Sequence, residues 1–180
     1  MCAIFGSLNL QLNENEIIKS LHSMKHRGPD SNGIYKDKNN KFSLFFGHNR
    51  LEILDIKNGT QPMISEDGNY VVVYNGEIYN FKELRKDLEN LGHKFFTDHS
   101  DTEILIHGYK QWKNDLPKYL NGMWAFAIYD KSKSQIFFSR DRFGEKPFFY
   151  YFKNNTFVFA SELSAITNFK NLDLELNNTN

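Results

Sequence analysis

The only cysteine of the 180-residue chain is Cys2, directly behind the initiator methionine. Removal of Met1 would leave a thiol and a free α-amine on the same residue. With pKa values of about 8.5 for the thiol and about 8 for the amine, such a residue carries its own general base near neutral pH. This combination predicts an N-terminal nucleophile. The alternative is a small apolar side chain that starts a strand, since free cysteines are commonly buried and inert.

Asn75 and Gly76 could supply the hydrogen-bond donors that an acyl-transfer site needs. They follow a predicted buried strand and offer a side-chain amide and a backbone N–H that a ligand can approach closely. Both donors suit the oxyanion of a tetrahedral intermediate. The alternative interpretation of an Asn-Gly pair is a hairpin turn.

Three charged residues could hold the two polar ends of a glutamine-like substrate. Arg50, at a predicted strand end, could bind a carboxylate with two parallel hydrogen bonds. Glu77 and Asp101, at predicted loop–helix junctions, could bind an ammonium group. Each could instead be a surface charge, and Asp101 could be part of a helix cap. His22 and His26 have the spacing of metal ligands but are interpreted as a solvated pair, so no metal site is expected.

The spacing of apolar residues predicts the elements that must position these side chains. Strands are predicted over residues 2–10, 42–47, 69–74, 123–130, 135–140, 148–152 and 156–160. Helices are predicted over 14–25, 80–91, from 100 onward, and briefly after 161. Residues 80–83 and 100–103 have the pattern of capping boxes. Two helices between groups of strands favour an α+β fold with antiparallel sheets.

Composition limits the classes of function. Lys and Arg number 22 and Asp and Glu number 22, so the net charge of zero argues against binding to nucleic acid or to an anionic membrane. The apolar runs are shorter than the roughly 20 residues of a membrane span, and no secretory signal is visible, so a cytoplasmic protein is expected. One cysteine allows neither an intramolecular disulfide nor a cysteine zinc cluster. The length predicts one domain.

Taken in order, six segments resemble the N-terminal glutaminase domain of glutamine-hydrolysing asparagine synthetases. That domain is a class II glutamine amidotransferase of the N-terminal nucleophile hydrolase family. The segments cover nearly the whole chain: MCAIFG at 1–6, HRGPD at 26–30, RLEILD at 50–55 leading to QPM at 61–63, NGEIYN at 75–80, SDTE at 100–103, and RDRFG at 140–144 leading to KP at 146–147.

The resemblance implies a four-layer αββα sandwich of two antiparallel sheets, and a reaction. Glutamine would be hydrolysed to glutamate and ammonia through a γ-glutamyl thioester on Cys2, whose α-amine is the general base. The implied roles are oxyanion donors for Asn75 and Gly76, carboxylate binding for Arg50, ammonium binding for Glu77 and Asp101, and pocket lining for Leu51, Ile53 and Leu54.

One departure from the family pattern bears on substrate binding. Glu52 stands beside Arg50, where the family usually has a small polar residue. A carboxylate at this position could pair with Arg50 and weaken the binding of glutamine.

Family members continue into a synthetase domain that binds ATP and Mg and activates aspartate. Residues 1–180 are expected to form the glutamine amidotransferase domain alone, with no cofactor of their own. The expected partner is a synthetase domain or subunit that accepts ammonia for aspartate, or for another acceptor such as a sugar in surface-polysaccharide synthesis. The alternative is a non-catalytic module that binds glutamine or docks a partner. The sequence predicts no oligomeric state.

Overall fold

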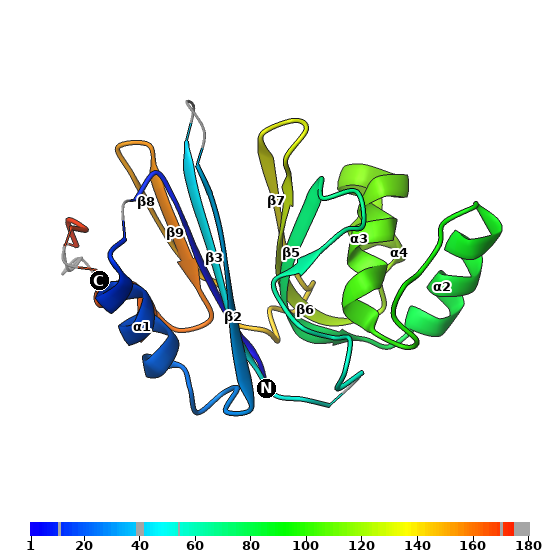
Figure 1. Ribbon diagram of the computed structural model, residues 1–180, viewed down its shortest axis with the longest axis horizontal. Coiled ribbons are helices and arrows are strands. Elements are labelled where there is room, and N and C mark those ends of the chain that lie inside the picture. The colour runs from blue at the N-terminus through cyan, green and yellow to red at the C-terminus, as the bar shows by residue number, and fades with distance from the viewer. Residues whose placement is uncertain (11, 39–41, 54, 170, 175–180) are drawn as a thin grey trace.

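The computed structural model describes residues 1–10, 12–38, 42–53, 55–169 and 171–174. Two antiparallel sheets lie face to face, and helices cover the outer face of each (Figure 1). The layers therefore run helix, sheet, sheet, helix. This arrangement confirms the predicted α+β sandwich, and it leaves the facing sides of the two sheets as a buried interior.

The first sheet contains five strands in the spatial order β2-β3-β1-β9-β8. Its central strand β1 pairs with β3 on one side, where Ala3 is opposite Asn49, and with β9 on the other. The strands are β1 (Ala3–Leu8), β2 (Ser31–Lys38), β3 (Ser43–Arg50), β8 (Phe149–Lys153) and β9 (Thr156–Ala160). The first residues of the chain thus enter the middle of a sheet, which fixes Cys2 at its end.

The second sheet contains four strands in the order β4-β5-β6-β7. Its long central pair keeps register from Tyr70 opposite Asp130 to Ile78 opposite Gly122. The strands are β4 (Met63–Ile64), β5 (Tyr70–Ile78), β6 (Gly122–Asp130) and β7 (Gln135–Arg140). Because β4 contributes only two residues, no other strand of the described residues lies beside most of the neighbouring edge of β5.

The helices pack on the outer faces of the sheets and complete three apolar layers. The helices are α1 (Glu14–Ser23), α2 (Phe81–Asn90), α3 (Asp101–Trp112), α4 (Leu116–Tyr119) and α5 (Leu163–Thr167), with a 3₁₀ turn at Lys113–Asp115. One apolar cluster lies under α1 and α5, one lies between the sheets, and one lies under α2 and α3. Alternation of side chains along each strand divides the apolar residues among these layers. Among the described residues, no helix is long and apolar enough to cross a membrane.

Most of the predicted elements are present, and two strands were missed. The strand predicted over 69–74 continues to Ile78, so Asn75 and Gly76 lie inside β5 and form no turn. The unpredicted strands are β2 and β4. Along β2 the residues alternate between partly buried and exposed, and none is fully buried. Its sequence therefore lacks the apolar run that identifies a buried strand.

Both predicted capping boxes are wrong, because the side chains of Asn80 and Glu103 bond to other partners. Asn80 donates to the Tyr119 carbonyl rather than capping α2, and Ser100 makes no side-chain cap on α3. A capping box does occur at the start of α1, where Asn13 and Glu16 exchange hydrogen bonds with each other's backbone N–H. Tertiary contacts decide which candidate boxes form.

Candidate active site

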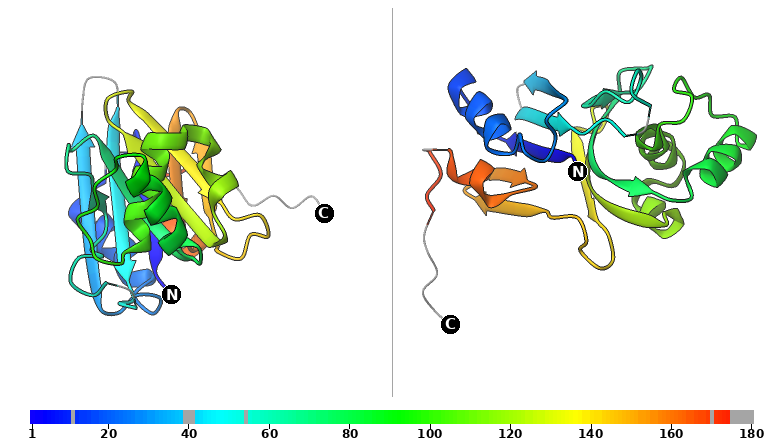
Figure 2. Two further views of the ribbon diagram at one scale, coloured as in Figure 1. Left: turned by 90° about the vertical axis from the view of Figure 1, so that its right-hand side faces the viewer. Right: turned by 90° about the horizontal axis from the view of Figure 1, so that it is seen from below.

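A cavity of about 120 Å³ opens beside the N-terminus, where β1 begins and β3 and β5 end. Seen from below, the N-terminus lies between the two sheets (Figure 2). Leu54 lies outside the described residues. Every other predicted site residue lines this cavity: Cys2, Arg50, Leu51, Ile53, Asn75, Gly76, Glu77 and Asp101. Side chains from distant parts of the sequence are thus gathered at one end of the sandwich.

Strand alternation aims two of these side chains into the space between the sheets. Cys2 precedes Ile4 by two residues, and Asn75 follows Val73 by two. Ile4 and Val73 both belong to the apolar cluster between the sheets. Because residues two apart share a face of a strand, Cys2 and Asn75 face each other's sheet. The two-residue period of the strands therefore places both side chains in the space between the sheets.

The thiol of Cys2 lies against the backbone of Leu51. The Leu51 N–H donates to Sγ at 3.4 Å, and Sγ is 3.7 Å from the Leu51 carbonyl oxygen. Burial raises the pKa of the Cys2 thiol, while the Leu51 backbone and the positive charges of the N-terminus and Arg50 oppose the rise. A thiol with a raised pKa is protonated at neutral pH. It requires a base before it can act as a nucleophile.

Met1 occupies the mouth of the cavity. The residue is 57 % exposed, and its thioether Sδ lies 3.3 Å from Nζ of Lys146, which is itself buried. Both residues line the cavity with Cys2. While Met1 is attached, the Cys2 nitrogen belongs to a peptide bond and is no base. Removal of Met1 would free that nitrogen and enlarge the space around it.

Asn75 presents an unused donor to the cavity. The residue is 1 % exposed, and within the described part of the chain its amide nitrogen Nδ2 has no hydrogen-bond partner. A buried amide without a partner is costly, which indicates that a ligand is meant to accept from it. Gly76 follows, and a Cβ there would collide with the backbone oxygen of Met123. The pair therefore fits an oxyanion site although it lies within a strand.

Arg50 is buried and already has several partners. Its Nη1 donates to the Ile56 carbonyl at 3.0 Å and its Nη2 to the Asp55 carbonyl at 2.7 Å. Glu52 Oε1 lies 3.5 Å from Nη1. The Glu52 carboxylate also accepts from the hydroxyl of Ser31. The pairing of Glu52 with Arg50 that the sequence suggested is therefore present.

Asp101 is buried at the first turn of α3 and has two donors. Its Oδ2 accepts from the Tyr74 hydroxyl at 2.8 Å and from the Ile78 N–H at 3.1 Å. Burial raises the pKa of Asp101, the two hydrogen bonds oppose the rise, and the negative charge of Glu77 adds to it. Glu77 lies in β5, so its predicted position at a loop–helix junction is wrong. The two carboxyl groups give this wall its negative charge.

Sequence reasoning missed four residues around the cavity. Gln61, Tyr74 and Lys146 line it, and His48 contacts Tyr74 from the other sheet. Gln61 and Lys146 lie in segments that carry the family resemblance, which could have drawn attention to them. The side chains of His48 and Gln61 bond to the backbone of Tyr74. These bonds depend on how the elements pair in space, so no local sequence pattern predicts the bonds.

The turn after β7 carries Lys146 of the cavity wall and is held by Asp141. The Asp141 carboxylate accepts backbone hydrogen bonds from Trp124 at 3.2 Å, Phe143 at 3.1 Å, Glu145 at 2.9 Å and Lys146 at 3.0 Å. Burial alone would raise the pKa of Asp141, but these N–H groups lower it overall. The ionised carboxylate therefore holds the turn that carries Lys146.

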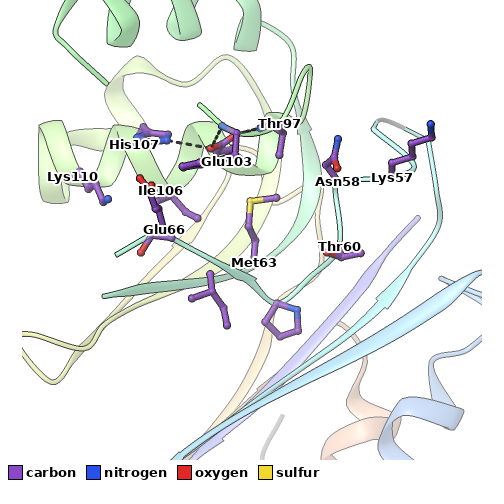
Figure 3. A pocket seen from close by; sticks show the side chains of 14 residues that line it. Lys57, Asn58, Thr60, Met63, Glu66, Thr97, Glu103, Ile106, His107 and Lys110 are labelled. Atoms are coloured by element: carbon purple, nitrogen blue, oxygen red, sulfur yellow. Dashed lines mark hydrogen bonds and ion pairs between the residues drawn. The ribbon is translucent and has the colours of Figure 1, made fainter. Parts of the chain in front are cut away.

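A larger cavity of about 550 Å³ lies beside α3 (Figure 3). Glu103 lies on its wall, and the Glu103 carboxylate accepts from Phe96 N–H, from Thr97 N–H and hydroxyl, and from His107. Burial opposes ionisation, but these donors lower the pKa of Glu103 to about 2. The carboxylate is thus fully occupied, and this cavity holds no thiol. The smaller cavity, where Cys2 and the unpartnered Asn75 amide meet, is therefore the candidate reactive centre.

The family described as glutamine amidotransferase domain matches residues 1–180. The chain is 40 % identical over 182 residues to "Asparagine synthetase [glutamine-hydrolyzing] 1" of Bacillus subtilis, which covers 98 % of this chain and 28 % of that protein. It is 41 % identical over 194 residues to "Putative asparagine synthetase [glutamine-hydrolyzing] 2" of Methanocaldococcus jannaschii, with 98 % and 37 % covered. The chain thus spans well under half the length of these relatives.

A solved structure confirms the fold. The B. subtilis glutamine phosphoribosylpyrophosphate amidotransferase, complexed with ADP and GMP, superposes with a TM-score of 0.76 at 23 % sequence identity. The match covers 92 % of this chain and 43 % of that one. At this identity the match shows the fold alone, that is, the arrangement of the sheets and helices.

Proposed function

Since the chain belongs to the glutamine amidotransferase domain family, we propose that its smaller cavity hydrolyses L-glutamine to glutamate and ammonia. The nucleophile is the thiolate of Cys2. The observation that carries this proposal is the meeting of the partly buried thiol of Cys2 with the unpartnered buried amide of Asn75 in one cavity. A nucleophile and an oxyanion donor at one place are the minimum for acyl transfer.

The α-amine of Cys2, freed by removal of Met1, is the general base. Acting through a water molecule, it takes the thiol proton, and the thiolate attacks the side-chain amide carbon of glutamine. The oxyanion that forms accepts hydrogen bonds from Asn75 Nδ2 and the Gly76 N–H. The protonated amine gives its proton to the leaving nitrogen, and ammonia departs. Water, deprotonated by the same amine, then hydrolyses the γ-glutamyl thioester to glutamate and restores the thiol.

The polar ends of glutamine meet opposite charges. Arg50 binds the α-carboxylate, and Asp101 and Glu77 bind the α-ammonium group, as their places on the cavity wall support. Leu51 and Ile53 line the path between these ends. Analogues that lack either polar end should be rejected strongly, because buried charges would then lose their partners.

The ammonia is proposed to serve an acceptor outside these residues. Relatives named asparagine synthetase support aspartate as that acceptor, amidated by a synthetase domain or subunit that uses ATP and Mg. A surface-polysaccharide sugar is the alternative acceptor. ATP-dependent amidation would place the protein in the cytoplasm. The glutaminase residues themselves need no metal or cofactor for the steps above.

A second candidate is a glutamine-binding module without turnover. It is favoured by one feature: while Met1 is attached, the Cys2 nitrogen belongs to a peptide bond and the proposed general base is missing. Calorimetry separates the two functions, because this candidate predicts that glutamine binds while no glutamate forms.

The test is glutamate release by protein whose loss of Met1 has been verified by intact mass. Turnover is expected, and Cys2→Ala should abolish it. Asn75→Asp is the matched variant for the oxyanion site, since it keeps the size but replaces the donor; its kcat should fall about 10²-fold or more. Equal rates in the wild type and Cys2→Ala would overturn the proposal.

A further inference from the structure

His48 joins the two sheets behind the proposed oxyanion site. It lies on β3 two residues before Arg50, is 0 % exposed, and faces β5 of the other sheet. Its Nε2 lies 3.1 Å from the backbone carbonyl oxygen of Tyr74, the residue before Asn75. None of the proposed catalytic steps uses this imidazole.

The geometry fixes the protonation state of His48. A carbonyl oxygen only accepts, so Nε2 carries the proton and donates it. Nδ1 has no partner among the described residues. Burial lowers the pKa of His48 to about 3, aided by the charge of Arg50 and opposed by the bond to Tyr74. Near neutral pH the imidazole is therefore neutral and donates only from Nε2.

The backbone of Tyr74 needs this donor. The short strand β4 pairs with β5 only at Val71 and Val72. Beyond them, Gln61 Oε1 accepts from the Tyr74 N–H at 2.6 Å, and His48 donates to the Tyr74 carbonyl. Two side chains thus take the place of a strand partner for a backbone that is buried.

We propose that His48 is a positioning residue for the oxyanion donors, because it holds the peptide between Tyr74 and Asn75. That peptide is planar, so fixing its carbonyl fixes the direction in which Asn75 leaves the strand. A shift of about 1 Å in a group at the reacting centre can lower a rate about 10²-fold. The inference rests on the proposed function, since it assigns Asn75 to the oxyanion.

Two substitutions of His48 separate this role from a structural one. His48→Gln keeps an amide N–H near the place of Nε2, whereas His48→Asn is too short to reach Tyr74. We expect kcat for glutamine to fall about 10- to 100-fold in His48→Asn and to stay within about 5-fold in His48→Gln, with little change of KM in either. Urea unfolding establishes that both variants are folded. Equal losses of kcat, or a loss confined to KM, would overturn the inference.

A second readout does not depend on turnover. In ¹⁵N–¹H spectra of Cys2→Ala protein, the Asn75 side-chain amide should give one sharp pair of signals when the original residue or Gln occupies position 48. In the additional His48→Asn variant, the pair should move or broaden. Unchanged signals contradict the role of His48 even if no variant hydrolyses glutamine. If protein with Cys2 intact does not hydrolyse glutamine while the Asn75 signals still respond to His48→Asn, the proposed function alone is contradicted.

Discussion

The guanidinium of Arg50, which lines the proposed glutamine cavity, lies 3.5 Å from the carboxylate of Glu52. Arg50 is thus the residue proposed to bind the substrate carboxylate and is also the partner of a carboxylate of its own chain. Only 4 % of Arg50 is exposed, so little water can reach it to screen the repulsion between the Glu52 carboxylate and the substrate carboxylate. The pair predicts that part of the affinity for glutamine is lost to internal competition.

Replacing Glu52 by Gln should release this competition. We expect KM for glutamine to fall about 2- to 5-fold with kcat little changed, the size expected for one partly exposed ion pair. Steady-state glutamate release measures both constants. Ser31→Ala is the matched control, because it removes the hydroxyl partner of Glu52 and leaves the charge in place. A rise of KM in Glu52→Gln would mean that Glu52 orients Arg50 for the substrate.

Removing the Tyr74 hydroxyl should make Asp101 harder to ionise. Its hydrogen bond favours the charged carboxylate, so Tyr74→Phe raises the pKa of Asp101 further. A smaller fraction of Asp101 is then ionised at acidic pH, and the acid limb of kcat/KM for glutamine moves to higher pH. At the acid end we expect kcat/KM about 10-fold below the wild type. Identical pH profiles would exclude Asp101 from ammonium binding.

Asp141→Asn should weaken the turn that carries Lys146. The neutral amide is a poorer acceptor for the backbone N–H groups, and the free energy of unfolding should fall by about 2 kcal/mol near neutral pH. Because the folded pKa of Asp141 is lowered, the stabilisation by the carboxylate is present above the ordinary pKa of aspartate and is lost as pH falls below it. In urea unfolding, the difference in free energy of unfolding between the wild type and Asp141→Asn should therefore be smaller near pH 3 than near pH 7. A difference that grows on acidification would contradict this account.

His48 should make the fold less stable in mild acid. Between about pH 6.5 and pH 4.5 the unfolded chain protonates this histidine and the folded chain does not, since its folded pKa is about 3. The free energy of unfolding then falls by up to about 1.4 kcal/mol per pH unit from this residue alone. The difference between wild type and His48→Gln in urea unfolding isolates that contribution. A constant difference across the window would mean that folded His48 takes up a proton.

Local patterns predicted the parts of the fold that carry strong alternation. The strand at 135–140 and the strand at 156–160 are found with the predicted bounds. The end of β5 was harder to predict, because Asn-Gly is typical of turns. Here the register with β6 continues to Ile78 and keeps the pair in the strand. Pairing with a distant strand overrode a local preference, as happens commonly in sheets.

The candidate site was predicted from residue types, and its supporting contacts were not. Residue type alone indicates the chemistry of the Cys2 thiol, the Asn75 amide and the Arg50 guanidinium. Gln61 and His48 act by satisfying the backbone of Tyr74, which requires knowledge of where β4 stops. Such contacts arise only when the two sheets are stacked, so a one-dimensional pattern does not contain them.

The most direct test of the account is the mass of the intact protein during turnover. Protein that has lost Met1 is mixed with glutamine, quenched in acid at millisecond to second times, and analysed by mass spectrometry with peptide mapping. The account predicts a transient adduct of one glutamyl group on Cys2, removable by hydroxylamine and absent from Cys2→Ala. Glutamate that accumulates with no Cys2 adduct at any quench time, or with the adduct on another residue, would contradict it.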